Sequence, residues 1–465
     1  MKSSDISNRR EFIRQSCCAA VGTTGMLSAI AQLKAIGAVS ADAVRPSSSQ
    51  LVTDFKALVC IFLSGGNDGT NVIIPYDTAS YNSYLQSRSV VALNKTDLLS
   101  IKPKTYSDGK SYALTPNMLE LKTLFDQGNL AFIGNVGTLV KPTTLSDYIA
   151  GTALPNQLYS HLDQTVQWQS SLPDQPVFKT GWGGRLADLL DSLNADHTIS
   201  MSLALDGGDY FGLGNNVIPY RINSGGVETL NGFYGNGMSS IRYSAIKQMF
   251  GSKPDNLIAN NFNDTTKTAI DESEFLLNLL NNAPTLKTTF PNSYTASKLK
   301  MVATMASIAP SLGLSRQIFF VSVGGFDTHT QQMASQPNLI KEVSEAMNAF
   351  YNSTIELGLS RQITTFTTSD FGRTYNPNSD GTDHGWGNLQ WIMGGAVKGG
   401  DIYGKMPSLL VGGNDDTGRG RWIPSTSVDE YNSTLAKWFG VSSTNMSTVL
   451  PNIGRFANPD LGFMI

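Results

Sequence analysis

Six short runs of apolar and β-branched residues recur along the chain, and few polar residues interrupt them. The runs are KALVCIFLS (56–64), NLAFIGNVG (129–137), TISMSLALDGG (198–208), RQIFFVSVGG (316–325), RQITTFTTS (361–369) and PSLLVGG (407–413). Continuous runs of this kind are typical of strands that are covered on both faces of a sheet. The pattern therefore predicts six buried strands.

Between these runs, apolar residues recur at helical spacing. The helical segments are PNMLELKTLFDQ (116–127), GWGGRLADLLDSLN (181–194), ESEFLLNLLNN (272–282), ASKLKMVATMASIAP (296–310) and NLIKEVSEAMNAFYNSTIEL (338–357). Strands that alternate with helices predict an α/β fold, with a mostly parallel sheet covered by helices on both faces. We expect one domain over residues 51–465. The stretch from about 215 to 292 is rich in Asn, Gly and Ser, and we interpret it as a cap-like insertion.

The first 43 residues differ from the rest of the chain. They contain the pair Arg9-Arg10, then EFIR, then a mildly apolar Ala/Gly-rich segment that ends in small residues suited to cleavage near Ala41 or Ala43. This order is typical of a twin-arginine signal, which the export machinery reads as an address. The alternative is an amphipathic first helix. The signal predicts a periplasmic, secreted or cell-surface protein whose first partner is the twin-arginine export machinery.

Composition narrows the class of protein further. The 465 residues are 40% hydrophobic and 15% charged, with a net charge of −3, so nothing indicates a nucleic-acid-binding surface. No run after the leader is apolar for long enough to predict a membrane span. Cys17 and Cys18 lie in the leader, which leaves Cys60 and excludes a disulfide within the mature chain.

Polar clusters follow the predicted strands. Their members are Asn67 and Asp68; Ser160, His161 and Asp163; Asp327 and His329; Asp370 and Arg373; and Asp383 and His384. Ligands of open α/β sheets bind beyond the carboxyl ends of the strands, where such clusters meet. Three of the four histidines lie in these clusters, and His197 is the exception.

Each cluster by itself has an ordinary explanation as a turn or a helix cap. Taken together, however, the carboxylates would repel one another unless a cation compensates them. Carboxylate and imidazole ligands suit Zn, Mn or Mg, with Fe and Ca as further alternatives. The sequence therefore predicts a divalent-metal site at the strand ends.

Several of these segments resemble one known family. They are LVCIFLSGGNDGTNVIIPYD, SHLDQTVQW, TGWGGRLAD, VGGFDTHTQQ, SDFGRTYNPNSDGTDHGWGN and GRGRWIPSTSVDEYNSTLAKWFG. In order along the chain, they resemble the exported domain-of-unknown-function family 1501. That family is similar to the alkaline-phosphatase-like superfamily of phosphatases, sulfatases and phosphoglycerate mutases. The resemblance implies a sheet of that type and one or two divalent ions bound by Asp and His.

Carried over to this chain, the resemblance implies a set of metal ligands. They are Asp68 after the first strand, Asp327 and His329 in the middle group, Asp370, and the final histidine His384. Phe371 stands where the superfamily has the histidine of its Asp-His pair, which leaves the second metal site without a nitrogen ligand. Asp383 is a possible replacement.

The nucleophile has two candidates. Ser160 lies at the start of a predicted helix, where the helix dipole favours an anionic substrate, and Thr70 lies two residues after Asp68. A plain N-terminal cap is the alternative role for Ser160. His161 is a further catalytic candidate. Arg373 and Arg185 are candidates for bidentate binding of phosphate or sulfate, with structural ion pairs as the alternative.

The resulting prediction is an exported, metal-dependent hydrolase of phosphate or sulfate esters. A protein that binds metal or an anionic polymer without turnover, and assists assembly or secretion at the cell surface, is the alternative, because a fold does not determine chemistry. Metal ligands that converge without a nearby hydroxyl would favour this alternative.

Overall fold

The computed structural model describes residues 54–205, 210–230, 233 and 235–465. The proposed signal, including Arg9 and Arg10, lies outside the described residues. The chain divides into two compact units, and the described residues of the smaller one are 229–230, 233 and 235–275. It contains α7 (Met238–Phe250) and most of α8 (Leu257–Asn281). This unit lies within the predicted insertion at 215–292, whose role as a cap stays a prediction.

The larger unit is built on a mixed, mostly parallel sheet. Its strands follow the order β11-β5-β10-β9-β1-β8-β6-β7, and β12 pairs with β5. All neighbours are parallel except β10, which runs antiparallel to both β5 and β9. The strands are β1 (Lys56–Leu63), β5 (Leu130–Gly137), β6 (Ser202–Leu205), β7 (Tyr220–Ile222), β8 (Arg316–Val323), β9 (Ile363–Ser369), β10 (Asn388–Met393), β11 (Asp401–Gly404) and β12 (Thr426–Ser427).

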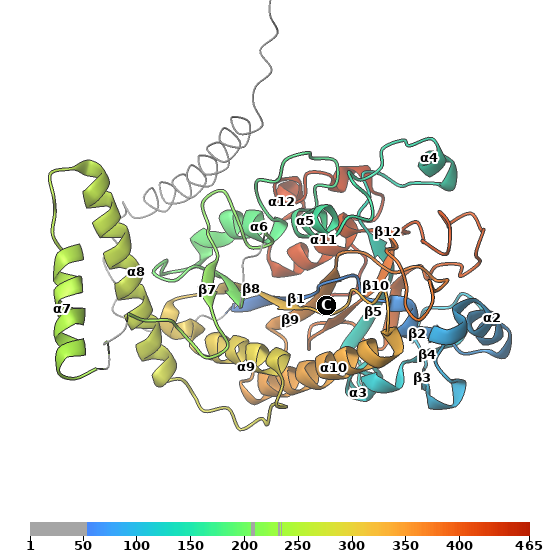
Figure 1. Ribbon diagram of the computed structural model, residues 1–465, viewed down its shortest axis with the longest axis horizontal. Helices are drawn as coiled ribbons and strands as arrows, with labels where there is room; N and C mark the ends of the chain where they lie inside the picture. Colours follow the sequence, from blue (N-terminus) through green and yellow to red (C-terminus); the bar gives the residue numbers. More distant parts are fainter. Residues whose placement is uncertain (1–53, 206–209, 231–232, 234) are drawn as a thin grey trace, which may run out of the picture. The chain divides into compact units, whose positions relative to one another are not determined.

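Helices cover both faces of this sheet, as the sequence predicts (Figure 1). One face carries α3 (Leu119–Asp126), α9 (Tyr294–Ser307) and α10 (Gln332–Glu356); the other carries α5 (His161–Ser170), α6 (Trp182–Leu190), α11 (Val428–Phe439) and α12 (Met446–Val449). Every residue of β5, β9 and β10 is buried. The expected α/β class is therefore confirmed. No helix in the described ranges is long and apolar enough to cross a membrane.

The remaining elements lie to one side of the sheet. A small antiparallel sheet contains β2 (Ile73–Pro75), β4 (Tyr112–Leu114) and β3 (Leu99–Ile101), next to α2 (Thr78–Arg88). The short helix α4 spans Leu145–Ile149.

One strand prediction is wrong. PSLLVGG forms a loop in which Leu409 has a φ of 59° and Leu410 is exposed. The sequence pattern also missed β10 and β11.

The strand register explains why distant loops meet. Leu63 at the end of β1 pairs with Val323 at the end of β8 and with Ser369 at the end of β9. These three parallel strands therefore end at one level, and the loops that follow them begin side by side. The polar clusters of the sequence lie on these loops and on the first turn of α5.

Candidate metal centre

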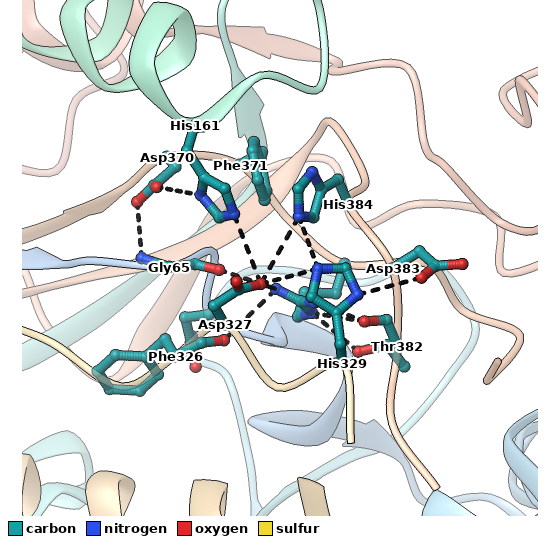
Figure 2. A network of polar contacts seen from close by, with 12 residues as sticks. Gly65, His161, Phe326, Asp327, His329, Asp370, Phe371, Thr382, Asp383 and His384 are labelled. Carbon is teal, nitrogen blue, oxygen red and sulfur yellow. Dashed lines mark hydrogen bonds and ion pairs between the residues drawn. The ribbon is translucent and has the colours of Figure 1, made fainter. Parts of the chain in front are cut away.

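Four side chains converge beyond the strand ends. His161, Asp327, His329 and His384 each offer one ligand atom, and these atoms lie within 4.8 Å of one another. His161 begins α5, Asp327 and His329 follow β8, and His384 lies between β9 and β10. The sequence prediction of a carboxylate–imidazole cluster at the strand ends agrees with this arrangement, and Figure 2 shows it.

The centre of the group is one oxygen of Asp327. Its Oδ1 lies 3.0 Å from His329 Nε2, 3.5 Å from His161 Nε2 and 3.6 Å from His384 Nε2. The two nitrogens His329 Nε2 and His384 Nε2 are 2.8 Å apart. In a tetrahedral zinc site with bonds of about 2.0–2.1 Å, neighbouring ligand atoms are about 3.3 Å apart. The observed spacings therefore fit a small divalent ion.

Each of the three histidines is oriented through its other ring nitrogen. His161 Nδ1 lies 2.7 Å from Asp370 Oδ2, and His329 Nδ1 lies 3.2 Å from Asp383 Oδ1. The third, His384 Nδ1, lies 2.8 Å from the carbonyl oxygen of Tyr159. Because these oxygens accept hydrogen bonds, Nδ1 is the nitrogen that carries the proton when each ring is neutral, and Nε2 then presents a lone pair. Metal-binding histidines in proteins show the same outer contacts.

This protonation pattern brings electron-rich atoms together. Three Nε2 lone pairs and the Asp327 carboxylate face one another, and His161 Nε2 is buried without a hydrogen-bond partner among the described residues. Such a group is unfavourable unless a proton or a cation lies within it. The residues present therefore fit a divalent metal.

The electrostatic environment differs between the ligands. Asp370 raises the pKa of His161, mainly through their hydrogen bond, against the opposing effect of burial. Burial lowers the pKa of His384. For Asp327, burial favours the neutral acid, but the hydrogen bond and charge of Arg373 outweigh it and lower the pKa. His384 and Asp327 are thus biased towards the forms that bind metal.

The centre is open to solvent on one side. The side chains of Asp327 and His329 are 46% and 40% exposed, whereas Asp370 behind His161 is 3% exposed. A ligand or water molecule can therefore reach the group from outside.

The structure corrects the expected position of Asp68, which lies away from this group. Its carboxylate is buried in an ion pair with Arg88 and also accepts hydrogen bonds from Thr70 and Gln332. Arg88 is the last residue of α2, and the carboxylate of Asp68 offsets the cost of burying its charge. The negative charge of Asp68 thus neutralises the positive charge of Arg88. Asp68 makes no contact with His161, Asp327, His329 or His384.

The two glycines before Asp68 explain the turn that follows β1. Gly65 has a φ of +116°, and a Cβ there would lie 2.3 Å from the backbone nitrogen of Asp327. Gly66 has a φ of +82°, and its Cβ would lie 2.5 Å from the ring of Phe371. Only glycine allows both the backbone angles and the close approach. The turn therefore lets the chain pass directly beneath the metal centre.

Phe371 fills the place next to the histidines. Its ring centroid lies 4.7 Å from that of His161 and 4.6 Å from that of His384, and the side chain is fully buried. Asp370 is hydrogen-bonded to His161 and to the backbone of Gly65, and so supports the centre from outside the four-residue group. Asp383 has the same kind of position, because it contacts His329 and is paired with Arg419.

Both candidate nucleophiles have other partners. Ser160 is the N-cap of α5, and its hydroxyl donates to Asp163 at 2.6 Å. The hydroxyl of Thr70 donates to Asp68. Neither hydroxyl contacts any of the four grouped side chains. The cap role of Ser160 is observed, and its role as a nucleophile stays a prediction.

The two candidate arginines are both buried. Arg373 Nη1 lies 3.0 Å from Asp327 Oδ1 and 2.8 Å from the carbonyl oxygen of Gly65, so it supports the central carboxylate. Arg185 donates to the backbone carbonyls of Ser170, Thr180 and Val449 and has no contact with the centre.

Two contributors to the group differ from the sequence prediction. His161, predicted as a catalytic candidate in a strand-end cluster, lies among the four candidate metal ligands. Tyr159 contributes a backbone oxygen and has a φ of 75°, which its side-chain identity does not reveal.

Comparisons with known proteins give a family for part of the chain. Residues 312–444 match the family described as "Protein of unknown function (DUF1501)", which confirms the resemblance over that segment. No curated protein matches the chain.

Similar solved structures are sulfatases and phosphatase-like enzymes. They include the PsFucS1 sulfatase from Pseudoalteromonas sp. (11% identity, 84% of this chain and 68% of that chain, TM-score 0.34). The lipoteichoic acid synthase LtaP from Listeria monocytogenes is 7% identical over 83% of this chain and 72% of that chain, with a TM-score of 0.34. The alkaline phosphatase from the Antarctic bacterium TAB5 is 11% identical over 74% of this chain and 92% of that chain, with a TM-score of 0.28. At these scores the likeness carries no argument about chemistry, which rests on the site itself.

Proposed function

We propose that this chain, whose residues 312–444 match the DUF1501 family, is an exported, metal-dependent hydrolase of phosphate or sulfate esters. The observation that carries the proposal is the convergence of three imidazole Nε2 atoms and one carboxylate on a solvent-facing point. Export rests on the twin-arginine pattern at Arg9-Arg10, and the partner there is the export machinery.

The proposed site holds one divalent ion, with Zn or Mn favoured by the three imidazole ligands over Mg or Ca. The carboxylate of Asp370 accepts hydrogen bonds from His161 and from the backbone of Gly65. Phe371 fills the position where the superfamily pattern has a histidine ligand. A bound ion supplies a positive charge that polarises an ester oxygen and lowers the pKa of a nucleophile.

The residues of the chain prepare this site. Arg373 keeps Asp327 ionised, and Asp370 fixes the ring of His161. Because the acceptors at each Nδ1 are already in place, the ligand atoms need little reorganisation when an ion binds. Such preorganisation is what distinguishes a functional centre from a chance cluster of polar groups.

A second function is favoured by one specific observation. The hydroxyls of Ser160 and Thr70 both donate to carboxylates, and neither contacts the four ligands. This arrangement supports the alternative of a protein that binds metal or an anionic surface polymer without turnover.

The two functions are separated by one screen. The purified mature protein is stripped of metal, reloaded with Zn, Mn or Mg, and assayed with phosphate and sulfate monoesters and diesters. Hydrolysis that requires metal and is lost in His384→Ala, but kept in His197→Ala, supports the hydrolase; His197 is an exposed histidine outside the centre. Bound metal without turnover of any ester supports the binding protein.

The same assay tests the nucleophile. If Ser160 attacks the ester, Ser160→Ala loses on the order of a thousandfold in rate or more, with metal content unchanged. If only Thr70→Ala has this effect, Thr70 is the nucleophile. If both variants remain active, neither hydroxyl attacks, and Ser160 acts as a helix cap alone.

A further inference from the structure

A short loop next to the metal centre holds two arginines in fixed positions. We call Asp416–Arg421 the arginine loop, because it contains Arg419 and Arg421. The buried carboxylate of Asp416 accepts hydrogen bonds from the backbone nitrogens of Gly418, Gly420 and Arg421 at 2.7, 2.8 and 3.1 Å. The loop is therefore ordered by its own backbone contacts before any ligand binds.

Arg421 is attached to a proposed metal ligand. Its Nε donates to the backbone oxygen of His384 at 2.8 Å, and its guanidinium lies 5.0 Å from the centre of the Tyr159 ring. The backbone oxygen of Tyr159 in turn accepts the hydrogen bond from His384 Nδ1. Arg421 is thus held between the two residues that fix one side of the centre.

Arg421 has no carboxylate partner among the described residues, unlike two other arginines near the centre. Arg373 is paired with Asp327 and Arg419 with Asp383, whereas Arg421 forms no ion pair with any described residue. Its two Nη nitrogens donate to none of the described residues, and the side chain is only half-buried. Pairs of guanidinium N–H groups bind the oxygens of phosphate or sulfate in bidentate fashion.

We propose that Arg421 binds the tetrahedral oxyanion of the ligand, a phosphate or sulfate group, beside the metal ion. This proposal rests on the proposed function and adds the residue that recognises the anionic group. Its ring and backbone contacts fix the guanidinium in advance, so that little conformational entropy is lost when the anion binds. The two Nη atoms provide the contact, and Nε keeps its bond to His384.

The test measures binding of the product anions rather than turnover. Inorganic phosphate and inorganic sulfate are titrated separately into metal-loaded and metal-free protein by calorimetry. The variants are Arg421→Gln and Arg421→Lys, and the matched control is Arg361→Gln, an exposed arginine just before β9 and so near the opposite ends of the strands. Metal content is measured for each.

The expected result is a loss of about tenfold or more in anion affinity for Arg421→Gln, because a charged hydrogen-bonding partner is removed. Arg421→Lys should retain part of the affinity, since lysine keeps the charge but loses the bidentate geometry. Metal content and the affinity of Arg361→Gln should be unchanged. The anion that binds more tightly, phosphate or sulfate, identifies which of the two ester classes the site prefers.

Two outcomes overturn the proposal. If Arg421→Gln binds both anions as well as the wild type does, Arg421 does not recognise them. If Arg421→Gln instead loses metal, the residue acts only by holding His384. Anion binding that depends on Arg421 in a protein that hydrolyses no ester would keep this inference and reject the hydrolase.

Discussion

The three histidines of the centre owe their roles to what each ring contacts on its far side. An imidazole has two nitrogens, and an acceptor at one of them determines which lone pair the other presents. His161 and His329 use carboxylates as acceptors, whereas His384 uses the backbone of Tyr159. Each of the three rings is thus held with its Nε2 towards the centre, although a different partner holds each one. Removing a partner should weaken the metal site while leaving all four ligands in the chain.

Asp370→Asn tests this directly. The substitution keeps the shape of the side chain but removes the charge, and loss of such an outer contact typically lowers metal affinity by about 10–100-fold. The pKa of His161 should also fall, because the hydrogen bond to Asp370 is the main cause of its increase. Zinc titration by calorimetry measures the affinity, and NMR measures the pKa.

A matched control is available for this variant. Asp191 lies 3.2 Å from His197 Nδ1 in an exposed pair outside the centre, so Asp191→Asn removes a comparable contact. Unchanged zinc affinity in Asp370→Asn would show that the contact does not orient a ligand.

At the scale of elements, the centre depends on three strands that end at one level. The parallel pairing of β1 with β8 and β9 places Gly65, Asp327 and Asp370 next to one another. The glycines after β1 matter here, because the loop after β8 passes within contact distance of them. A side chain at Gly65 would move Asp327, the carboxylate that all three histidines face.

Gly65→Ala should therefore lower both stability and metal content. A residue forced into this backbone angle costs about 1–3 kcal/mol, and its Cβ would meet the backbone of Asp327 at 2.3 Å. Gly324→Ala is the control, since no described atom beyond its two chain neighbours lies within 4 Å of a Cβ there, and its φ is not in the left-handed region. Denaturant unfolding and metal analysis measure the two effects. Equal behaviour of the two variants would contradict the account of this turn.

Much of this architecture was predictable from the sequence. The runs that form β1, β5, β6, β8 and β9 are continuous stretches of apolar or β-branched residues, a pattern typical of buried strands. β10 escaped prediction because Asn388 and Gln390 lie on it, and both are buried with partners on other elements, Phe371 and Thr367. PSLLVGG was apolar but lies on the surface in a loop with a left-handed residue.

The site was predictable as a group of clusters but not in its roles. Residues that follow predicted strands are expected to meet beyond the carboxyl ends of the sheet, and sequence order alone shows which residues these are. This expectation holds for His161, Asp327, His329 and His384. Asp68 also follows a predicted strand, yet its partner Arg88 lies twenty residues later on α2. Which of several acids meets an arginine depends on packing, and no local pattern contains that information.

At the scale of the whole molecule, metal binding and folding should be linked, because the four proposed ligands come from separate parts of the chain. An ion bound by all four would bind only the folded state and should stabilise it. Protons compete for the same nitrogens, and His161 holds its proton to a higher pH than an ordinary histidine, whose pKa is about 6.5. Because protons compete with the ion, the stabilisation of the folded protein by metal depends on pH.

The stabilisation by metal should increase as pH rises from about 6 to 8. The raised pKa of His161 contributes stability to the metal-free protein below the unfolded pKa, and this contribution is lost as pH rises through the folded pKa. The metal-bound form, in contrast, uses the neutral ring. Burial raises the pKa of Asp429 to about 8, but Asp429 is remote from the ligands and should affect both forms equally. Thermal melts with and without zinc give the difference, and a difference that shrinks with pH would contradict the assignment of His161.

The central claim is that His161, Asp327, His329 and His384 bind one divalent ion. Elemental analysis of the mature protein after metal loading and removal of free metal tests it most directly, with His384→Ala and His197→Ala measured in parallel. The account predicts one ion per chain in the wild type and in His197→Ala, and a large loss in His384→Ala. A wild type that retains no ion, or a His384→Ala variant with full metal content, would contradict it.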